Sequence, residues 1–417
     1  MTNSIEGYAQ EGDKSSSSGR LTKASIAFVL GLLGVSYLFN AMDRQVFPAL
    51  LGGVRATYGL TLAQAGFVST VFTINVAIFG ALSGWFLARF TRKSILVGGL
   101  VGYSLFTMVT PLAQGFTSLA LYRSLTGVGE ALQIATIYAC MGCYFGKNRG
   151  SAMGVMQAFF GLGALAGPVV GTRLSQLLGS WQAPLYLFGI AGLVIAAAVA
   201  LFVPAGFSEA KEGEERGERA SSAPSEMPAL LNRNVCFGAM SFALVGLSFF
   251  SYTALYATFL HEHLSFSAVA AGSALGMYGV GAIGAVVGGW AGDRLGKAGM
   301  FVCLVILAVA GFFMFNGAER PLIHGALSFL FGLMVSGYFY ARFVAIIQRS
   351  AHPNQIGYAV AAAMAGFYLS GPFAGYLFGK LVEMWGWSTA ADVVVVAPPV
   401  VAIVLMSFFD FGRLRNA

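Results

Sequence analysis

The chain of 417 residues is 57% hydrophobic and 10% charged, with a mean hydropathy of +0.75 and a formal net charge of +7. Soluble domains carry about a quarter charged residues, so this composition excludes an ordinary water-soluble protein. The basic residues cluster beside apolar runs, which indicates membrane topology and argues against a nucleic-acid-binding surface.

Apolar runs long enough to cross a bilayer core of about 30 Å follow one another along the chain. In the first half they lie at about 24–51, 62–88, 94–114, 117–141, 150–176 and 184–204. In the second half they lie at about 234–260, 267–292, 299–316, 323–347, 356–380 and 389–411. We therefore predict an all-α polytopic membrane protein with twelve transmembrane helices in two six-helix, pseudo-symmetric halves.

Polar segments separate the two sets of apolar runs and flank them. Residues 1–22 are polar and serine-rich, and we expect a disordered tail without a signal peptide. We expect six-helix bundles at 23–205 and 234–411, joined by a charged linker at 206–233 and followed by a short tail at 412–417.

Lys and Arg residues are divided unequally between the two sides of the predicted bundle. One side holds those of 14–23, 89–93, 147–149, 211–233, 294–297, 349 and 413–415. The other side holds Arg55, Arg173, Arg320 and Lys380. Because cytoplasmic segments carry the excess of positive charge, both termini and the linker are predicted to be cytoplasmic, in a protein of the plasma membrane.

The two halves repeat the same landmarks. Gly167-Pro168 in the fifth run recurs as Gly371-Pro372 in the eleventh, at an offset of 204 residues (168 to 372). Trp181 and Trp385 follow at the same offset. We expect the glycine–proline pairs to shape helix packing. Repeated halves of a polytopic protein place the ligand site at their interface near the bilayer midplane.

Charged residues interrupt the first and fourth apolar runs. Asp43 and Arg44 lie where an ionisable side chain costs at least about 2.5 kcal/mol, so they need partners or an aqueous cavity. Arg123 and Glu130 are seven residues apart and therefore share one helix face. We predict that the four charges meet within the membrane.

Two interpretations of this cluster stay open. A fixed lattice of ion pairs would only set helix register. Alternatively, Glu130 and Asp43 couple proton binding to transport, while Arg44 and Arg123 hold a substrate anion. Further candidate substrate contacts are Tyr37, Asn40, Gln133, Tyr256 and Arg342. For Tyr256 aromatic core packing competes with ligand contact, and Arg342 could instead extend to the lipid headgroups.

Two spacings typical of metal or redox sites occur without supporting residues. Cys140-x-x-Cys143 has no second pair, and His261-Glu-His263 is expected in a solvated loop. We therefore predict no metal and no cofactor. The sequence also lacks a nucleotide-binding loop and a catalytic triad pattern, so we predict that the chain is not an enzyme.

The motifs resemble those of the major facilitator superfamily over nearly the whole chain. The loop signature of that family is matched in the second half by Gly289, Asp293, Arg294, Gly296 and Lys297, which the resemblance implies are cytoplasmic gating residues. The first half keeps Arg92 of this signature but has Ala88 in place of its acidic residue. Met42-Asp43-Arg44 together with Arg123-x-x-x-Gly-x-Gly-Glu130 is most similar to the Spinster branch and to the anion:cation symporter branch.

The resemblance implies a secondary transporter that works by alternating access, with a small-molecule substrate, protons and the lipid bilayer as its partners. A proton-coupled carrier of a small organic anion is our first interpretation. A Spinster-like exporter of lysolipids, amphiphiles or drugs is the alternative, and a non-transporting membrane receptor is a third. We expect a monomer that binds no nucleic acid.

Overall fold

The computed structural model describes residues 22–145, 149–209, 232–351 and 355–411. Residues 1–21 of the predicted tail at 1–22, the predicted tail at 412–417 and most of the predicted linker at 206–233 lie outside these ranges. The backbone of 286–295 is described, but its side chains, which include the predicted gating residues Asp293 and Arg294, are not.

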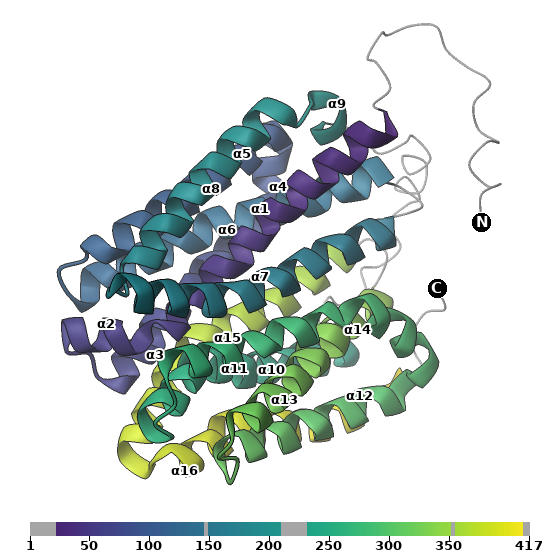
Figure 1. Cartoon of the computed structure of the whole chain (residues 1–417). Coiled ribbons are helices and arrows are strands. Elements are labelled where there is room, and N and C mark those ends of the chain that lie inside the picture. Colours follow the sequence, from purple (N-terminus) through teal and green to yellow (C-terminus); the bar gives the residue numbers. More distant parts are fainter. Residues whose placement is uncertain (1–21, 146–148, 210–231, 352–354, 412–417) are drawn as a thin grey trace, which may run out of the picture.

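The first half is a bundle of helices that run alternately up and down (Figure 1). Its elements are α1 (Lys23–Ala49), α2 (Leu51–Tyr58), α3 (Leu62–Thr70), α4 (Phe72–Arg89), α5 (Arg92–Val109), η1 (Thr110–Leu112), α6 (Phe116–Phe145), α7 (Arg149–Leu178), α8 (Ala183–Phe202) and α9 (Ala205–Ser208). Helices α3 and α4 together form one crossing.

The second half repeats this arrangement beside the first. Its elements are α10 (Arg233–Thr258), η4 (Phe259–His263), α11 (Ala268–Ile283), α12 (Ala285–Phe315), α13 (Pro321–Gly332), η5 (Leu333–Phe339), α14 (Tyr340–Ser350), α15 (Ile356–Trp385), α16 (Trp387–Ala391), η7 (Asp392–Val396) and α17 (Ala397–Ser407). The segments η4, η5 and η7 are π-helical turns that interrupt or extend α-helices.

Each of the twelve predicted runs is helical in the described part of the chain. Ten helical segments there are long and apolar enough to cross a membrane by themselves. The eleventh crossing is α6, which carries the charges of Arg123 and Glu130. The twelfth combines α11 with the first part of α12. The prediction of an all-α polytopic fold is confirmed.

Gly296 separates two crossings within α12. Its φ of 56° and ψ of −141° lie outside the helical region, so the chain turns there although the helix is continuous in hydrogen bonding on either side. A positive φ costs a residue with a Cβ considerably more than it costs glycine. This requirement explains a glycine at this position of the loop signature, where it connects the eighth and ninth crossings.

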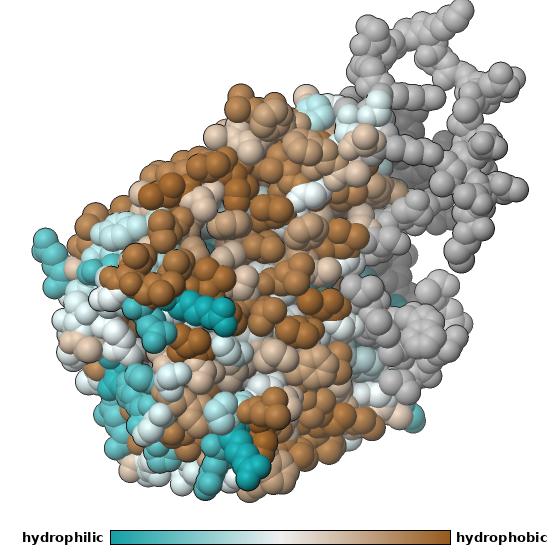
Figure 2. All heavy atoms as spheres, in the orientation of Figure 1, coloured by the Kyte–Doolittle hydropathy of each residue, from teal (hydrophilic) through white to brown (hydrophobic). Residues whose placement is uncertain are grey.

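The helical bundle has two ends, the terminal face and the distal face. The terminal face is the end where α1 begins and α17 ends, and the distal face is the opposite end, where α2 and α16 lie (Figure 1). In the space-filling view apolar residues cover the sides of the helices, and hydrophilic residues gather at the distal face (Figure 2). Apolar sides on the helices are the surface expected of a protein that crosses the membrane many times.

Glycines bring the two halves together at mid-helix and toward the distal face. A Cβ on Gly66 of α3 would lie 2.0 Å from the carbonyl oxygen of Gly375 in α15, and a Cβ on Gly279 of α11 would lie 2.3 Å from that of Gly161 in α7. Closer to the terminal face, a Cβ on Gly84 of α4 or Gly154 of α7 would meet no atom within 4 Å. The close glycine contacts between the halves therefore lie at mid-helix and toward the distal face.

Candidate functional site

Two buried ion pairs join α1 to α6 at the centre of the first half. Arg44 Nε lies 2.7 Å from Glu130 Oε2, and Arg123 Nη1 lies 3.3 Å from Asp43 Oδ2. The exposed fractions of these four residues are 8% or less. The four charges thus meet inside the membrane, but Glu130 contacts Arg44 rather than Arg123, its neighbour on the same helix face.

Polar side chains extend this contact in both directions. Thr107 of α5 donates a hydrogen bond of 2.6 Å to Asp43 Oδ1. Nearer the terminal face, Asn40 Nδ2 donates to Gln133 Oε1 at 2.8 Å, and Gln133 Nε2 donates to the carbonyl oxygen of Ser36 at 3.0 Å. A stripe of polar residues on α1 therefore faces a matching stripe on α6, because residues three, four and seven apart share one helix face.

The two ion pairs differ in what surrounds them. The guanidinium of Arg123 is fully buried and lies 4.6 Å from the ring centroid of Phe47, so cation–π contact and Asp43 hold it in place. Arg44 Nε and Glu130 Oε2 are close but lack the alignment of a hydrogen bond, and within the described residues neither Glu130 oxygen accepts one. Arg44 Nη2 likewise donates none to a described residue.

Arg44 reaches a central cavity of about 80 Å³ between the two halves. The lining residues from the first half are Tyr37, Arg44, Gln45, Pro48, Ser69, Phe72, Ile134, Tyr138, Gln157 and Phe160. Those from the second half are Phe249, Phe250, Thr253, Tyr278, Ser336, Tyr340, Phe367 and Tyr368. Among the described lining residues, the guanidinium of Arg44 is the only charged group, and most of the others are aromatic.

A larger cavity of about 270 Å³ lies at the distal face, away from the ion pairs. We assign the candidate substrate site to the smaller central cavity, because it alone of the two contains an ionised group that is paired within the membrane. Its volume is close to that of two or three water molecules. A substrate would therefore have to displace aromatic side chains as it binds.

The sequence-predicted contacts divide between this lining and the structure behind it. Tyr37 and Arg44 line the cavity, and Tyr37 hydroxyl is 3.2 Å from that of Tyr138. Asn40 and Gln133 lie behind Arg44 in the polar stripes and bind each other. Arg342 is partly buried in α14 and is not among the lining residues.

Tyr256 lies in the interior of the second half rather than at the cavity. Its hydroxyl is 2.8 Å from His324 Nδ1, and His324 Nε2 is 3.0 Å from the carbonyl oxygen of Ala318. The carbonyl can only accept, so Nε2 donates to it, and in the neutral ring Nδ1 accepts from Tyr256. Both residues are fully buried, so Tyr256 packs in the interior in this structure, and its contact with substrate stays a prediction.

The predicted gating residue Arg92 binds within its own half. Its Nη1 donates to the carbonyl oxygen of Ser208 at 3.3 Å, and its Nη2 donates to Cys143 Sγ at 3.2 Å. The backbone nitrogens of Arg92 and Lys93 donate to the carboxylate of Glu209. The start of the linker is thereby fixed to the N-terminus of α5. Lys297 is exposed beside the turn at Gly296.

The predicted packing residues lie at close helix contacts. A Cβ on Gly167 would be 2.6 Å from the carbonyl oxygen of Met42 in α1, whereas one on Gly371 would be 2.4 Å from Thr73 Oγ1 of α4, in the other half. Pro168 and Pro372 each lie inside a helix, α7 and α15. The repeated motif thus packs within one half in α7 and between the halves in α15.

Sequence analysis missed several lining residues, including Phe72, Tyr138, Gln157, Phe250 and Tyr368. On α10 the sequence favoured Tyr256, whereas Phe249, Phe250 and Thr253 reach the cavity. Phe249 and Tyr256 are seven residues apart and share one helix face, so spacing alone does not separate the residues at the cavity from those in the interior of the second half.

The family model described as Major Facilitator Superfamily matches residues 33–375 and 240–413 of the chain. The chain belongs to the Major Facilitator Superfamily. Because this is a family of transporters, membership confirms the prediction of a transporter rather than an enzyme. It also supports a multi-pass protein of a membrane.

Curated relatives are similar to parts of the chain. The sphingosine-1-phosphate transporter SPNS2 of Xenopus tropicalis is 28% identical over 54% of this chain and 43% of its own length. The 3-(3-hydroxy-phenyl)propionate transporter of Escherichia coli (strain K12) is 28% identical over 54% of both proteins. The chain spans about half the length of these relatives.

A solved structure of a bacterial homologue of the human lysosomal transporter Spinster, in an inward-facing and occupied conformation, has the same fold. It superposes with a TM-score of 0.75 at 16% sequence identity and covers 95% of this chain and all of that one. At this identity the likeness concerns the fold.

Proposed function

We propose that this protein is a proton-coupled secondary transporter of a small aromatic carboxylate. The observation that carries the proposal is the position of Arg44, a single cation in the lining of a largely aromatic cavity, with Glu130 buried beside it. A guanidinium binds a carboxylate through charge-assisted hydrogen bonds, and aromatic side chains provide surface for a planar apolar body. The relative that transports 3-(3-hydroxy-phenyl)propionate supports this class.

The coupling follows from competition for one guanidinium. An ionised Glu130 neutralises Arg44, whereas a protonated Glu130 leaves the positive charge to a substrate anion. Substrate binding and protonation of Glu130 therefore favour each other, and this coupling is reciprocal. Proton and anion would cross the membrane together. The cycle would be completed when the halves open at the distal face and close at the terminal face.

An amphiphile such as a lysolipid is the second candidate substrate. Phe249, Phe250 and Phe367 of the second half give that side of the cavity an apolar surface. The similarity to a sphingosine-1-phosphate transporter supports the same class. The two candidates differ in the size of the apolar part and not in the need for Arg44.

Uptake by the purified protein in liposomes tests the proposal. We expect 3-(3-hydroxyphenyl)propionate to accumulate when the pH gradient drives protons in the direction of uptake. In Arg44→Lys, which keeps a cation beside Glu130, we expect the KM to rise about tenfold to hundredfold, because one charged hydrogen bond contributes about 1.5–3 kcal/mol.

The exposed distal residue Arg320 provides the matched control, since Arg320→Lys should leave KM unchanged. Gradient-dependent uptake of a lysophospholipid, with none of the aromatic acid, would favour the amphiphile. Absence of uptake for both classes would contradict transport of either class.

We further propose that the terminal face is cytoplasmic and that the protein resides in the plasma membrane. The structure would then be inward-facing, because the close contacts between its halves lie at mid-helix and toward the distal face. A tag inserted after Ala220 should be labelled only after cells are permeabilised, whereas a thiol at Gln114, exposed at the distal face, should be labelled in intact cells. Labelling of the tag in intact cells would reverse this orientation.

A further inference from the structure

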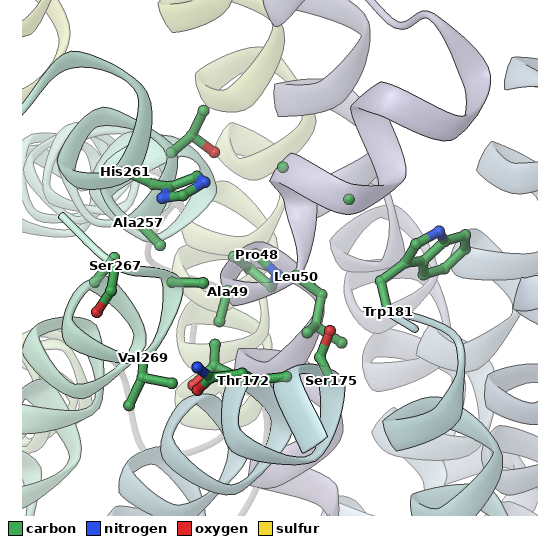
Figure 3. Close-up of a pocket in the computed structure, with 16 residues that line it drawn as sticks. Pro48, Ala49, Leu50, Thr172, Ser175, Trp181, Ala257, His261, Ser267 and Val269 are labelled. Atoms are coloured by element: carbon green, nitrogen blue, oxygen red, sulfur yellow. The ribbon is translucent and has the colours of Figure 1, made fainter. Parts of the chain in front are cut away.

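The larger cavity at the distal face is built by both halves of the protein. Its volume is about 270 Å³, close to the lower limit of about 300 Å³ for small-molecule pockets. Pro48, Thr172 and Trp181 line it from the first half, and Ala257 and His261 line it from the second (Figure 3). A molecule bound there would contact both halves.

Hydrogen-bonding groups line this cavity, and its described lining has no guanidinium like that of Arg44 in the central cavity. Thr258 is 3% exposed, and its hydroxyl has no hydrogen-bond partner among the described residues. Ser175 and Gln176 add a hydroxyl and an amide from α7. His261 Nδ1 donates to the carbonyl oxygen of Phe266 at 2.7 Å, so its ring is held at the edge of the cavity. A buried hydroxyl without a partner is costly, which indicates that Thr258 binds something that the protein itself does not supply.

The two cavities lie end to end along the same helices. Pro48 of α1 lines both of them. On α10, Thr253 lines the central cavity and Ala257 lines the distal one. These two residues are one helical turn apart, or about 6 Å along the axis. The distal cavity is therefore the next space that a molecule leaving the central site toward the distal face would enter.

The wall between the cavities is a weak point of α1. Pro48 has no backbone N–H, so the carbonyl of Arg44 lacks its usual helical donor. The helix ends at Ala49, and α2 begins at Leu51 after Leu50 has left the regular helical region. Leu50 N–H still donates to the carbonyl oxygens of Val46 and Phe47. The missing bond at Arg44 therefore weakens α1 at the boundary between the two spaces without ending the helix there.

Polar contacts between the halves lie at the distal face beside this cavity. Arg55 of α2 forms an ion pair with Glu262 of η4, in which Arg55 Nη1 donates to both carboxylate oxygens. Glu383 at the end of α15 accepts a hydrogen bond of 3.2 Å from the backbone nitrogen of Ala63 in α3. Both side chains of the ion pair are partly exposed, so water can reach and separate them.

We propose that the distal cavity is a second binding site for the transported aromatic carboxylate, occupied on the path between the central site and the distal face. The aromatic body would lie against Pro48 and Trp181, and a substrate oxygen would accept the hydrogen bond of Thr258. The described lining residues include no arginine, so this site binds more weakly than the one at Arg44. The inference rests on the proposed function, because it assumes that an aromatic carboxylate passes through the protein.

Protection of an introduced thiol tests this site in the full-length protein in liposomes. In Ser175→Cys, a charged, membrane-impermeant thiol reagent added at the distal face should react with the new thiol. We expect 3-(3-hydroxyphenyl)propionate to slow this reaction severalfold. Cys140 and Cys303 are buried, and Cys143 and Cys236 lie toward the terminal face, so the native thiols should not interfere.

Two second-site variants separate local binding from an effect of the central site. Protection should persist in Ser175→Cys/Arg44→Lys, because the distal site does not use Arg44. In Ser175→Cys/Thr258→Val, about fivefold more substrate should be needed for the same protection, since one neutral hydrogen bond contributes about 1 kcal/mol. A thiol at Gln114, on the same face but outside the cavity, should not be protected.

Several results would overturn the second site. They are loss of protection in the Arg44→Lys background, absence of protection while the same liposomes take up the substrate, and failure of the reagent to reach the Ser175→Cys thiol. Protection without uptake would keep the distal site and contradict the proposed function. A compound that is neither transported nor protective would contradict both.

Discussion

Protein carrying Glu130→Gln is expected to exchange substrate across the membrane at close to the wild-type rate but to lose accumulation driven by a pH gradient. Glutamine imitates the protonated carboxyl in shape and charge, so Arg44, which lies 2.7 Å from Glu130 in the native protein, stays available to the anion. A side chain that cannot release a proton removes the thermodynamic link between proton and substrate. Exchange needs only binding and the conformational change.

The pH dependence of the exchange reaction checks the same argument by a second measurement. In the native protein, lowering the pH should lower the KM, because protonation of Glu130 frees Arg44. In Glu130→Gln the KM should no longer change with pH. Glu319→Gln, a change at an exposed carboxylate in a distal loop, is the control and should retain both accumulation and pH dependence.

Gradient-driven accumulation in Glu130→Gln would reject this assignment. If accumulation were then lost in Asp43→Asn instead, the proton would belong to the other ion pair. If neither substitution affected it, proton coupling itself would be wrong and substrate entry would follow its own gradient.

Breaking the second ion pair should damage the fold more than the transport cycle. Arg123 and Asp43 are at most 2% exposed, and each neutralises the other beside the ring of Phe47. Removing one partner leaves an uncompensated buried charge, for which we expect a loss of about 3–5 kcal/mol. We therefore expect Asp43→Asn or Arg123→Ala alone to lower both the expression level and the Tm of the detergent-purified protein.

A double substitution separates charge from packing. Asp43→Asn/Arg123→Gln removes both charges together, so its Tm should recover a large part of the loss seen in the single variants. The partly exposed pair of Arg55 and Glu262 provides a comparison, because Arg55→Ala should cost less than about 1 kcal/mol. Single variants at Asp43 and Arg123 with native Tm values would show that this pair does not stabilise the fold.

Each of the two interpretations that the sequence left open, a structural ion pair or a coupling site, corresponds to one of the two ion pairs. We propose that the pair of Arg123 and Asp43 acts as a fixed structural contact, since both side chains are enclosed by protein. Arg44 borders the cavity, and its pairing with Glu130 leaves polar atoms of both residues without hydrogen bonds to the described residues. That incomplete pairing is what a proton or a substrate anion could change.

The sequence determined the membrane class, the number of helical crossings and the meeting of four charges. Each of these depends only on the length of the apolar runs and on the positions of charged residues within them. Hydrocarbon requires long helical runs, since backbone polar groups cannot remain unpaired there. A charge within such a run requires a partner of opposite charge. Few charged residues lie within the apolar runs, so Asp43, Arg44, Arg123 and Glu130 were expected to pair with one another.

Only the tertiary structure decided which charge contacts which and which helix faces line the cavity. Glu130 shares a helix face with Arg123, yet the approach of α1 places Arg44 beside it. The faces of α10 that carry Tyr256 and Phe250 are both apolar, because lipid, protein interior and cavity all accept aromatic side chains in a membrane. Which face turns inward depends on how closely the glycine-lined helices of the two halves approach, and that distance is a property of the packed bundle.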